Sequence, residues 1–443
     1  MHNLTGQHLA ILGAGRSGLG AARLARRLGA QVTVFDEGDP DKLGAALERL
    51  RAESFEVVVG NAARERLLQA GEFSEAVLSP GLDAGWPLPQ RFAASGAHLT
   101  GEMEFGFRHN TTPLIAITGT NGKSTCTEIT AAILNGCGLK SLPCGNHGIP
   151  LSEVVDSGAA YDVLALEISS FQLETIERFR PRVAVWLNFA PDHLDRYPDL
   201  ASYFAAKARI FENLTCDDLA VVRAGESVDS GAARRVTFSA TGAGADWTWD
   251  AGVIRHRGAE VGRTDRIRLR GRHNLENLLA ALAACHEFGL PVPAMLEAAA
   301  AYSPPAHRCE LVRVWQGREF INDSKATNLH ALEACLVSMD RPIVLIAGGK
   351  DKQLDYRPLR SLLPGRVRAL VLIGEIAPQL QAAFTALLPC ATASDMNDAV
   401  QRAARLSQEG DLVILSPGTS SFDMYNGYAQ RGEAFRQAAQ TLS

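Results

Sequence analysis

The sequence lacks several features that would mark whole classes of protein. No apolar run approaches the roughly 18 residues of a membrane-spanning helix. The N-terminus, MHNLTGQHLAIL, has no basic segment ahead of an apolar stretch, so a secretory signal is not expected. Basic residues are not in excess, because 44 Lys and Arg stand against 49 Asp and Glu and leave a formal charge of −5. We therefore expect neither a membrane protein, a secreted scaffold nor an electrostatically driven nucleic-acid binder.

Paired cysteines are also missing. The chain has eight cysteines, and none of them forms a Cys-x-x-Cys pair. They stand at positions 126, 137, 144, 216, 285, 309, 335 and 390. In a chain of this length, scattered cysteines are typical of reduced thiols in a cytoplasmic protein, with neither a zinc site nor a disulfide framework.

What the sequence does contain is the pattern of an α/β protein. Its 443 residues correspond to about three domains at ~150 residues each, and 46% apolar and 21% charged residues are ordinary for a globular chain. Short β-branched runs alternate with helical patterns almost throughout, which predicts βαβ units and parallel sheets. The expected strands are His8–Leu12, Gln31–Phe35, Leu114–Ile117, Val163–Leu166, Val183–Leu187, Glu319–Asn322, Pro342–Ile346, Ala369–Ile373 and Leu412–Leu415.

Two polar, proline-marked breaks divide the pattern. They are His109-Asn-Thr-Thr-Pro113 and Tyr302-Ser-Pro-Pro-Ala306. We therefore predict three α/β domains over residues 1–111, 112–303 and 304–443. Residues 220–270 are expected to form short antiparallel strands appended to the middle domain. No internal repeat or low-complexity tract is evident.

A first glycine-rich turn, Gly13-Ala-Gly15-Arg-Ser-Gly18, follows a strand and opens a helix. This is the arrangement of a dinucleotide-binding turn, in which glycines let the backbone approach a phosphate at the helix N-terminus. Asp36 ends the next strand, where an acidic residue can accept from a ribose hydroxyl. A second turn, Leu78-Ser-Pro-Gly81, could add amides to the same site. The pattern fits NAD, FAD or a nucleotide-sugar diphosphate, and it also fits a simple packing turn.

A second glycine-rich turn, Gly119-Thr-Asn-Gly122-Lys123-Ser124-Thr125, also lies between a strand and a helix. Its amides would cradle phosphates, Lys123 would reach the β- and γ-phosphate oxygens, and Ser124 or Thr125 could bind Mg²⁺. The strict phosphate-binding motif has a glycine where this chain has Ile117, so the turn is a shorter variant. It predicts binding of ATP or a close relative.

Two further groups follow strands of the same region. Glu167 comes directly after Val163–Leu166, and His193 follows the next strand within Asn188-Phe-Ala-Pro-Asp192-His193. A carboxylate and a neutral imidazole at adjacent strand ends are plausible ligands for a cation beside a triphosphate. The alternative for His193 is a loop or capping role.

Lys207 lies on a predicted helix, Leu200–Asn213, that Asp199 could cap. Leu200, Tyr203 and Lys207 share one apolar stripe, which turns the lysine inward. Burial would leave a neutral, nucleophilic amine that can capture CO₂ as a carbamate. Alternatively, its stem only covers apolar surface while the charge reaches water.

Three polar loops follow strands of the third region. Asp323 and Lys325 come after Glu319–Asn322, Gly348-Gly-Lys-Asp-Lys352 after Pro342–Ile346, and Ser416-Pro-Gly-Thr-Ser-Ser421-Phe422 after Leu412–Leu415. Each alone could be a solvated turn, but three at one sheet edge predict a binding rim.

In this order, the segments GTNGKST, EISSFQLE, NFAPDHLDRY, AAKARIFEN, GRHNLENLLAA, AHR, NDSKATN, GGKDK and SPGTSSFDMYNGYAQRG resemble the Mur ligases over all three domains. SSFQLE and NDSKATN are similar to the members that add D-glutamate to UDP-N-acetylmuramoyl-L-alanine in peptidoglycan precursor synthesis. The resemblance implies a Rossmann-like N-terminal domain, a central ATP-binding domain of the P-loop type and a Rossmann-like C-terminal domain. It also implies a cytoplasmic monomer whose domains close over the substrates.

The resemblance further implies a reaction and its residues. ATP would phosphorylate the alanyl carboxylate, and the glutamate amine would then displace phosphate. Lys123, Glu167, His193 and Lys207 would be catalytic. The UDP-sugar would contact Ser17, Asp36, Ser79, Pro80, Gly81 and Asn146. ATP would contact Gly119, Thr120, Asn121, Gly122, Lys123, Ser124, Thr125, Asn277, Arg308, Asp323 and Lys325. Glutamate would contact Thr327, Lys352, Ser421 and Phe422. Two Mg²⁺ ions would bind Ser124, Thr125, Glu167, His193 and carbamylated Lys207.

Two departures from the family pattern keep alternatives open. His147 stands where an apolar residue is common, and Pro417-Gly-Thr-Ser-Ser421 replaces Pro-Ala-Cys-Ala-Ser beside the amino-acid pocket. A ligase that adds L-glutamate to the same acceptor is therefore an alternative. Folylpolyglutamate synthase is another, although its two-domain plan leaves the first 110 residues unexplained. A nicotinamide-dependent oxidoreductase would leave GTNGKST unexplained, and a nucleotide sensor would leave Glu167, His193 and Lys207 without a role.

Overall fold

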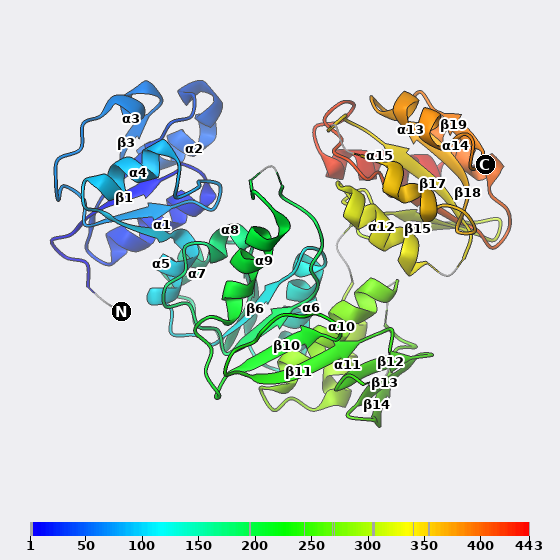
Figure 1. Ribbon diagram of the computed structural model, residues 1–443, viewed down its shortest axis with the longest axis horizontal. Helices are drawn as coiled ribbons and strands as arrows, with labels where there is room; N and C mark the ends of the chain where they lie inside the picture. Colours follow the sequence, from blue (N-terminus) through cyan, green and yellow to red (C-terminus); the bar gives the residue numbers. More distant parts are fainter. Residues whose placement is uncertain are drawn as a thin grey trace. The chain divides into compact units, whose positions relative to one another are not determined.

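The computed structural model describes residues 3–194, 196–242, 244–267, 269, 271–303, 306–339, 341–352 and 355–442 (Figure 1). The chain divides into two compact units. One comprises Met1–Ile267 with Glu276–Ala301, and the other comprises Arg268–Leu275 with Tyr302–Ser443. Across the described residues, no helix is both long and apolar enough to cross a membrane. Three sheets form the framework, two in the first unit and one in the second. The boundaries near residues 111 and 303 remain predictions.

The first sheet is a doubly wound parallel sheet with strand order β3-β2-β1-β4-β5. Its elements are β1 (His8–Leu12), α1 (Arg16–Arg27), β2 (Gln31–Asp36), α2 (Pro40–Ala52), β3 (Glu56–Val59), α3 (Asn61–Glu65), β4 (Glu75–Leu78), α4 (Pro87–Ala94), β5 (His98–Gly101) and α5 (Glu102–Arg108). Alternate residues of β1 pack into two separate apolar clusters, so both faces of the sheet are covered. The strand order reverses between β1 and β4, which is where such sheets bind ligands.

The second sheet carries nine strands in the order β14-β13-β12-β11-β10-β9-β6-β8-β7. Its first elements are β6 (Leu114–Thr118), α6 (Lys123–Gly136), β7 (Ser141–Gly145), α7 (Leu151–Asp156), β8 (Val163–Glu167), α8 (Ser170–Leu173), β9 (Val183–Trp186), α9 (Leu200–Ala208) and the 3₁₀ helix η1 (Arg209–Phe211). The rest are β10 (Leu219–Arg223), β11 (Arg234–Ser239), β12 (Trp247–Asp250), β13 (Val253–His256), β14 (Ala259–Arg263), α10 (Arg272–His286) and α11 (Val292–Ala301).

The structure corrects the prediction of antiparallel strands over residues 220–270. Strands β10, β11 and β12 continue the sheet in parallel from β9, and only the β12–β13 and β13–β14 pairs are antiparallel. The connection from β10 to β11 spans residues 224–233, which is short for a parallel crossover. Connections of this length usually join antiparallel neighbours, whereas here the chain returns and adds β11 in the same direction as β10.

Helix α9 is also shorter than predicted. It ends at Ala208 and continues as the 3₁₀ turn η1, whereas a helix to Asn213 was expected. Asp199 caps it as predicted, since its carboxylate accepts from the Ser202 amide at 2.7 Å. Leu200 is exposed rather than inward, because it is the first helical residue. The inward stripe therefore begins at Tyr203, and it includes Lys207 as expected.

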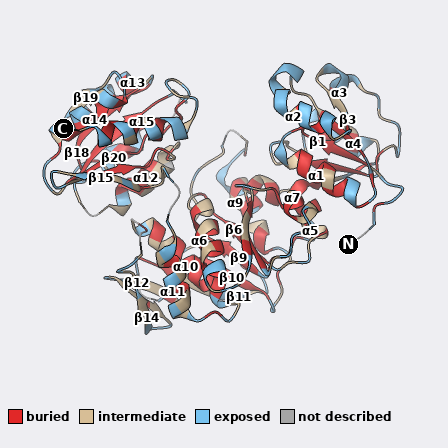
Figure 2. Ribbon diagram, turned by 180° about the vertical axis from the view of Figure 1, so that it is seen from behind, coloured by how far each residue is buried: buried red, intermediate tan, exposed pale blue. Residues whose placement is uncertain are grey.

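The third sheet has the order β15-β16-β20-β17-β18-β19, with only the β15–β16 pair antiparallel. Its elements are β15 (Glu310–Trp315), β16 (Arg318–Asn322), α12 (Leu329–Ser338), β17 (Ile343–Gly348), the 3₁₀ helix η2 (Arg357–Ser361), β18 (Val367–Ile373), α13 (Ala377–Phe384), β19 (Cys390–Thr392), α14 (Met396–Leu406), β20 (Leu412–Leu415) and α15 (Tyr428–Gln440). Its central strands β16, β20, β17 and β18 are largely buried (Figure 2), because helices cover both faces, whereas the edge strands β15 and β19 are only half-buried.

Candidate functional site

Four parallel strands of the central sheet end at one edge and deliver polar residues there. In the order β9-β6-β8-β7, they lead into Asn188, the Gly119–Thr125 turn, Glu167 and Asn146. The sequence predicted that Glu167 and His193 follow adjacent strands. In the structure β8 and β9 are not neighbours but flank β6, so the glycine-rich turn lies between the two loops.

The Gly119–Thr125 turn packs closely against α10. Gly122 adopts a left-handed conformation with φ of 85°, and a Cβ there would lie 2.4 Å from Asn277 Oδ1. Asn277 is therefore beside the turn, although 152 residues separate it from Thr125 (277 − 125). The Lys123 Nζ donates to the carbonyls of Gly119 and Thr120, at 2.9 and 3.0 Å. The lysine thus folds back over its own turn.

Asn188 fixes the turn from the neighbouring strand, and the sequence analysis gave it no role. Its Oδ1 accepts from the Asn121 amide at 2.9 Å, and its Nδ2 donates to the Asn121 carbonyl at 3.0 Å. Its own carbonyl accepts from the Thr120 amide at 3.0 Å. These three hydrogen bonds fix the conformation of the turn without a ligand. Ser124 and Thr125 follow in the first turn of α6, with Thr125 buried.

Glu167 is buried at the end of β8. Its Oε1 accepts from Asn146 Nδ2 at 2.9 Å, and the Asn146 amide donates to the Glu167 carbonyl at 2.9 Å. Its Oε2 is also buried, and it has no hydrogen-bond partner among the described residues. A buried carboxylate oxygen without a partner is costly, and a cation would compensate it. Asn146 and Glu167, which the resemblance assigned to different ligands, are therefore direct neighbours.

Lys207 has 1% of its surface exposed and reaches the same turn. Its Nζ donates to the Gly119 carbonyl at 3.2 Å and lies 4.9 Å from the centre of the Tyr203 ring. Burial lowers the pKa of Lys207 well below its ordinary 10.5, and the charge of Lys123 lowers it further. Asp192 and Glu167 act in the opposite direction. The predicted inward orientation is confirmed, and the environment favours the neutral form of the amine.

The loop after β9 brings His193 and Asp192 to this edge. His193 has a positive φ of 56°, and its ring packs edge-on against Phe171 and Tyr203, with centroids 4.9 and 5.8 Å apart. Its Nε2 lies 3.8 Å from an Asp192 carboxylate oxygen. Asp192 was not among the predicted site residues. The signal was its position inside the Asn188–His193 segment, together with its electrostatic effect on Lys207.

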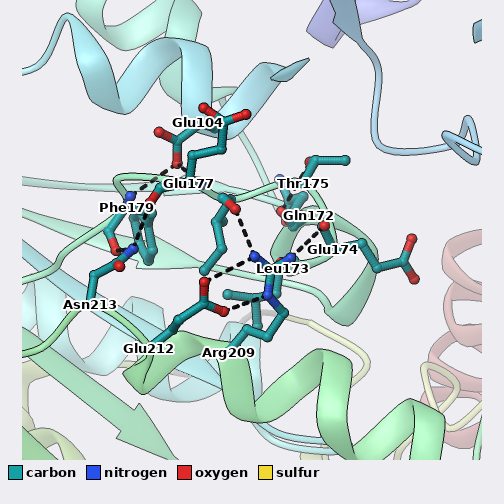
Figure 3. A network of polar contacts seen from close by, with 11 residues as sticks. Glu104, Gln172, Leu173, Glu174, Thr175, Glu177, Phe179, Arg209, Glu212 and Asn213 are labelled. Atoms are coloured by element: carbon teal, nitrogen blue, oxygen red, sulfur yellow. Dashed lines mark hydrogen bonds and ion pairs between the residues drawn. The ribbon is translucent and has the colours of Figure 1, made fainter. Parts of the chain in front are cut away.

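A polar network behind this edge anchors the segment that follows α8 (Figure 3). Arg209, two residues after Lys207, donates to the carbonyls of Leu173, Glu174 and Ile176. On the other side, both carboxylate oxygens of fully buried Glu104 accept from the backbone amides of residues 177–179. The network ties α5, the α8 segment and the end of α9 together, and so supports both Glu167 and Lys207.

The N-terminal sheet carries the other glycine-rich turn at its switch point. A Cβ at Gly18 would lie 1.8 Å from the Gly13 carbonyl oxygen, so the close approach of α1 requires glycine. Ser79, after β4, lies against Gly13, and its hydroxyl is buried without a hydrogen-bond partner among the described residues. Pro80 and Gly81 complete that turn, and Ser17 lies in the first turn of α1. The structure thus brings the two turns together, as predicted.

Asp36 has a structural role that the sequence did not reveal. Its Oδ2 accepts from the Ala14 amide at 2.7 Å, and its Oδ1 accepts from the Gly38 amide at 2.7 Å. The carboxylate therefore fastens the glycine-rich turn to the end of β2. It remains half-buried, which leaves part of it accessible to a ligand.

The C-terminal unit holds its own group of predicted residues. Strands β16, β20 and β17 are neighbours, so the loops after them share one edge, as expected. Asp323 follows β16, and burial raises its pKa to about 6. Its Oδ2 accepts from the Ser416 hydroxyl at 2.9 Å. Lys325 Nζ lies 5.2 Å from the centre of the Tyr428 ring, and Arg308 precedes β15.

The loops proposed to hold an amino acid are linked to one another. Lys352 Nζ donates to the Thr327 carbonyl at 3.4 Å, and the Gly418 amide donates to the Ala326 carbonyl at 3.0 Å. Ser421 is buried, whereas Phe422 is 67% exposed. An exposed aromatic side chain beside a polar pocket is available for ligand contact.

Arg431, on α15, joins all three loops and was missed by the sequence analysis. It is 1% exposed and donates to the carbonyls of Ser324, Gly348 and Thr419, at 2.9, 3.5 and 3.1 Å. Burial lowers its pKa to about 10. The only sequence signal was an arginine in an otherwise buried position of a helix. Its partners are three backbone carbonyls and the Ser324 hydroxyl, which lie elsewhere in the sequence and leave no pattern.

The predicted ATP residues therefore fall into two groups. Gly119–Thr125 and Asn277 belong to the first unit, while Arg308, Asp323 and Lys325 belong to the second. The UDP-sugar residues all lie in the first unit and the glutamate residues in the second.

Three family models match the chain. The Mur ligase middle domain matches residues 117–285, and the Mur ligase, glutamate ligase domain matches residues 307–418. The alanine dehydrogenase/PNT C-terminal domain matches residues 3–83.

Curated relatives match over nearly the full length. A UDP-N-acetylmuramoylalanine–D-glutamate ligase of Geobacter metallireducens is 39% identical, with 99% of this chain and 98% of the relative covered. One of Anaeromyxobacter dehalogenans is 41% identical, with 98% of each chain covered. Among solved structures, a UDP-N-acetylmuramate–alanine ligase of Thermotoga maritima is similar with a TM-score of 0.59 at 17% identity, covering 98% of this chain and 99% of that one. A pseudomurein peptide ligase of Methanothermus fervidus gives a TM-score of 0.62 at 15% identity, covering 97% and 99%.

Proposed function

Because this chain belongs to the Mur ligase family, we propose that it uses ATP to join D-glutamate to UDP-N-acetylmuramoyl-L-alanine. Full-length similarity to D-glutamate ligases carries this proposal. The central edge supports it, because a glycine-rich turn with a lysine over it, a buried carboxylate oxygen without a hydrogen-bond partner among the described residues and a buried lysine with a lowered pKa converge there. The reaction supplies a cytoplasmic precursor of peptidoglycan, and thus serves cell shape and division.

The proposed chemistry activates a poor electrophile. An oxygen of the alanyl carboxylate attacks the γ-phosphorus of ATP, which forms an acyl phosphate and releases ADP. The amine of D-glutamate then attacks the acyl carbon, phosphate leaves, and the amine loses one proton to solvent. Phosphoryl transfer relies on positioning and on neutralising charge rather than on covalent chemistry by the protein.

Lys123 is the residue we assign to the γ-phosphate. In the structure its Nζ is satisfied by the Gly119 and Thr120 carbonyls, so phosphate oxygens would replace two neutral acceptors with charged ones. The amides of Gly119–Gly122 would hold the remaining phosphate oxygens, and Asn277 would contact the nucleotide from α10. Arg308, Asp323 and Lys325 would bind the same ATP from the C-terminal unit.

The residues present fit magnesium. Glu167 offers the buried Oε2 atom, Ser124 and Thr125 offer hydroxyls, and oxygen is the ligand that Mg²⁺ prefers. When bound, Mg²⁺ neutralises charge on the phosphate oxygens. We propose a second ion held by His193 and Lys207. An amine is a poor magnesium ligand, so this second site requires a change at Lys207.

We propose that Lys207 is carbamylated. Its neutral amine can attack CO₂, forming an N–C bond and releasing one proton to solvent. The product is a carbamate, which places a negative charge near Lys123 in place of an amine. The lowered pKa of Lys207 supports this step, because only the neutral amine is nucleophilic.

We assign the UDP moiety to the switch point of the N-terminal sheet. The buried Ser79 hydroxyl and the amides of the Ser79–Gly81 turn face the glycine-rich turn, and Ser17 and Asp36 border it. Asn146, next to Glu167, would contact the muramoyl end of the same substrate near the phosphate.

We assign D-glutamate to the rim of the C-terminal sheet. Lys352 and Ser421 would meet its carboxylates, with Thr327 and Phe422 at its side. Because ATP residues occur in both units, we propose that a monomer closes during the cycle, with domain boundaries near residues 111 and 303. Small-angle scattering with an ATP analogue and acceptor should show a more compact particle, and an unchanged profile would count against closure.

The decisive experiment is phosphate release from Mg-ATP and UDP-N-acetylmuramoyl-L-alanine with D-glutamate, L-glutamate or no amino acid. We expect release only with both the acceptor and D-glutamate. A preference for L-glutamate would retain the chemistry and correct the specificity at residues 416–422. Release with a folate acceptor alone, or no release from folded protein supplied with bicarbonate, would refute the proposal. Tightly bound NAD would instead favour the oxidoreductase.

A further inference from the structure

Two cysteines, an aspartate and a histidine converge in the C-terminal unit, and no step proposed above uses the cysteines. Cys309 precedes β15, Asp323 follows β16 and Cys335 lies in α12. Their two sulfurs and one carboxylate oxygen lie within 4.8 Å of one another. The Nε2 of His273, from the first turn of α10, lies 4.0 Å from the Cys309 sulfur.

We propose that Cys309, Cys335, Asp323 and His273 form a binding site for one zinc ion or a similarly thiophilic divalent ion. Two thiolates, one carboxylate oxygen and one imidazole nitrogen make a tetrahedral donor set of the type that zinc prefers. No sequence motif predicts this metal site, because its four ligands come from separate elements. The sequence analysis expected no zinc site because the chain has no Cys-x-x-Cys pair. That argument does not apply to a site whose ligands come from separate elements.

The distances among Cys309, Cys335 and Asp323, and between Cys309 and His273, can be compared with those of a filled site. With Zn–S of about 2.3 Å and Zn–N of about 2.0 Å, tetrahedral geometry places two sulfurs about 3.8 Å apart and a sulfur and nitrogen about 3.5 Å apart. The observed Cys309–His273 distance of 4.0 Å needs a contraction of about 0.5 Å, and the 4.8 Å limit on the two sulfurs and the carboxylate oxygen needs contractions of up to about 1.3 Å. The imidazole contacts Cys309 but lies outside that group of three, so its ring must also turn toward their centre. Side-chain rotation supplies such a change without moving the sheet.

The surroundings orient the ligands. The Asp323 carboxylate accepts from the Ser416 hydroxyl at 2.9 Å and from the Cys309 amide at 3.3 Å, which leaves lone pairs for a metal. The Nδ1 of His273 is buried without a partner among the described residues. Gly271 makes room for this ring, since a Cβ there would lie 2.9 Å from His273 Cε1.

A purely structural explanation accounts for only part of this arrangement. Cys309 and Cys335 belong to an apolar cluster, where small thiols pack well. Such packing does not explain a carboxylate beside two sulfurs, because a buried charge without a cation is unfavourable. A divalent ion would resolve this, with the two thiol protons passing to solvent as the thiolates bind it.

Metal binding here has a consequence that rests on the proposed function. Asp323 is one of the residues assigned to ATP, and a carboxylate bound to zinc is less available to a nucleotide. Zinc should therefore inhibit the ligase, and added ATP should oppose the inhibition. The metal site itself does not depend on this consequence.

The test is a titration of the full-length, reduced protein with Cd²⁺, followed by the ultraviolet absorption band of cadmium thiolate. We expect one equivalent to bind, and Zn²⁺ to compete. Cys335→Ser should weaken binding by more than the roughly 10–100-fold that loss of an outer-sphere partner causes. The matched controls are Cys216→Ser, which removes an exposed thiol, and Cys285→Ser, which removes a buried one in the other unit. Neither should change binding.

Three outcomes would overturn the site. They are no thiolate band, a band that persists in both Cys335→Ser and Cys309→Ser, and loss of two free thiols with oxidation to a disulfide in place of metal uptake. X-ray absorption of the zinc-loaded wild type does not depend on a variant folding, and it should show two sulfur and two nitrogen or oxygen ligands. Binding without inhibition would refute only the effect on ATP, and inactive protein that still binds Cd²⁺ would count against the proposed function alone.

Discussion

The molecule contains two glycine-rich turns that share a backbone plan and differ in the groups around them. Each follows the first strand of a parallel sheet and opens a helix. The N-terminal turn is fastened by the Asp36 carboxylate, and its one basic residue, Arg16, donates to the Gly148 carbonyl at 2.8 Å and pairs with Glu153. The central turn carries Lys123 above its own carbonyls and lies against buried Lys207.

This difference shows that glycines determine where a backbone can approach a ligand, while the neighbouring charges determine which ligand is suitable. A carboxylate beside a turn repels the charge of a triphosphate, but it can accept hydrogen bonds from the hydroxyls of a nucleoside or sugar. A turn with a lysine over it suits a γ-phosphate. Glycine spacing alone therefore could not distinguish a nicotinamide site from a UDP site.

The largest effect should come from removing the charge of the central turn. Lys123→Ala should lower kcat on the order of 10³-fold, because one preorganised positive group opposite the transferred phosphoryl group is lost. Its melting temperature should stay near that of the wild type, since the two hydrogen bonds of Nζ to the Gly119 and Thr120 carbonyls lie within its own turn. Steady-state phosphate release and thermal unfolding measure the two properties. Lys140→Ala, which removes an exposed lysine before β7, is the control and should retain full activity.

A substitution in the N-terminal turn tests whether its close backbone packing requires glycine. Gly18→Ala should destabilise the protein by about 3 kcal/mol, because the new Cβ meets the Gly13 carbonyl at 1.8 Å and α1 must move. Gly15→Ala is the matched control, since a Cβ there has nothing within 4 Å. Urea unfolding followed by circular dichroism compares the two. Equal stability of both variants would show that the turn tolerates a shift and that its glycines serve only the ligand.

Exchanging the polar group of the N-terminal turn should have a smaller and selective effect. Asp36→Asn keeps one accepting oxygen but removes the charge, so the KM for the UDP-sugar should rise roughly tenfold while the KM for ATP does not change. Initial rates at varied concentrations of each substrate separate the two. An equal rise in both KM values would indicate that Asp36 supports the fold of the first unit generally.

The smallest expected effect concerns stability at the central turn. Lys207→Met should raise the melting temperature by about 2–4 °C in bicarbonate-free buffer at pH 7, while abolishing activity. The folded-state pKa of Lys207 lies well below the unfolded value of 10.5. The unfolded chain therefore binds more protons between these two pKa values, and wild-type stability rises with pH across that window. The advantage of methionine should shrink as the pH approaches 10.5, and a constant difference would show that burial of the amine is not its cause.

The sequence predicted the features that repeat locally. Strands such as His8–Leu12 and Leu412–Leu415 are found with the predicted bounds, because buried parallel strands are continuous apolar runs. The loops at their carboxyl ends were therefore also placed correctly. Asn188 and Arg431 were missed because they act through backbone atoms of distant segments. The predicted antiparallel direction of β11 was wrong, because a series of short strands does not reveal the direction in which each one joins the sheet.

Asp36 shows the limit of reading a role from position alone. The position of Asp36 suggested a ligand contact, and the structure adds that the same carboxylate fastens two backbone amides. A residue type and its position do not reveal how many partners it already has. Only the structure shows such partners, because they can be distant in the sequence. Ala14, whose amide donates to Asp36, lies 22 residues before it.

The place of β20 has a consequence for the order in which the protein is synthesised. It lies between β16 and β17 in the sheet, although it leaves the ribosome after both of them, and Arg431 follows later still. A nascent chain that ends before residue 412 thus has a complete phosphate-binding turn but no shared neighbour for β16 and β17, and nothing to fasten their loops. Domains generally fold as units during translation, in order from the N-terminus. Unfinished chains should therefore lack the assembled rim of the C-terminal sheet, to which we assign the amino acid, even when their phosphate-binding turn is complete.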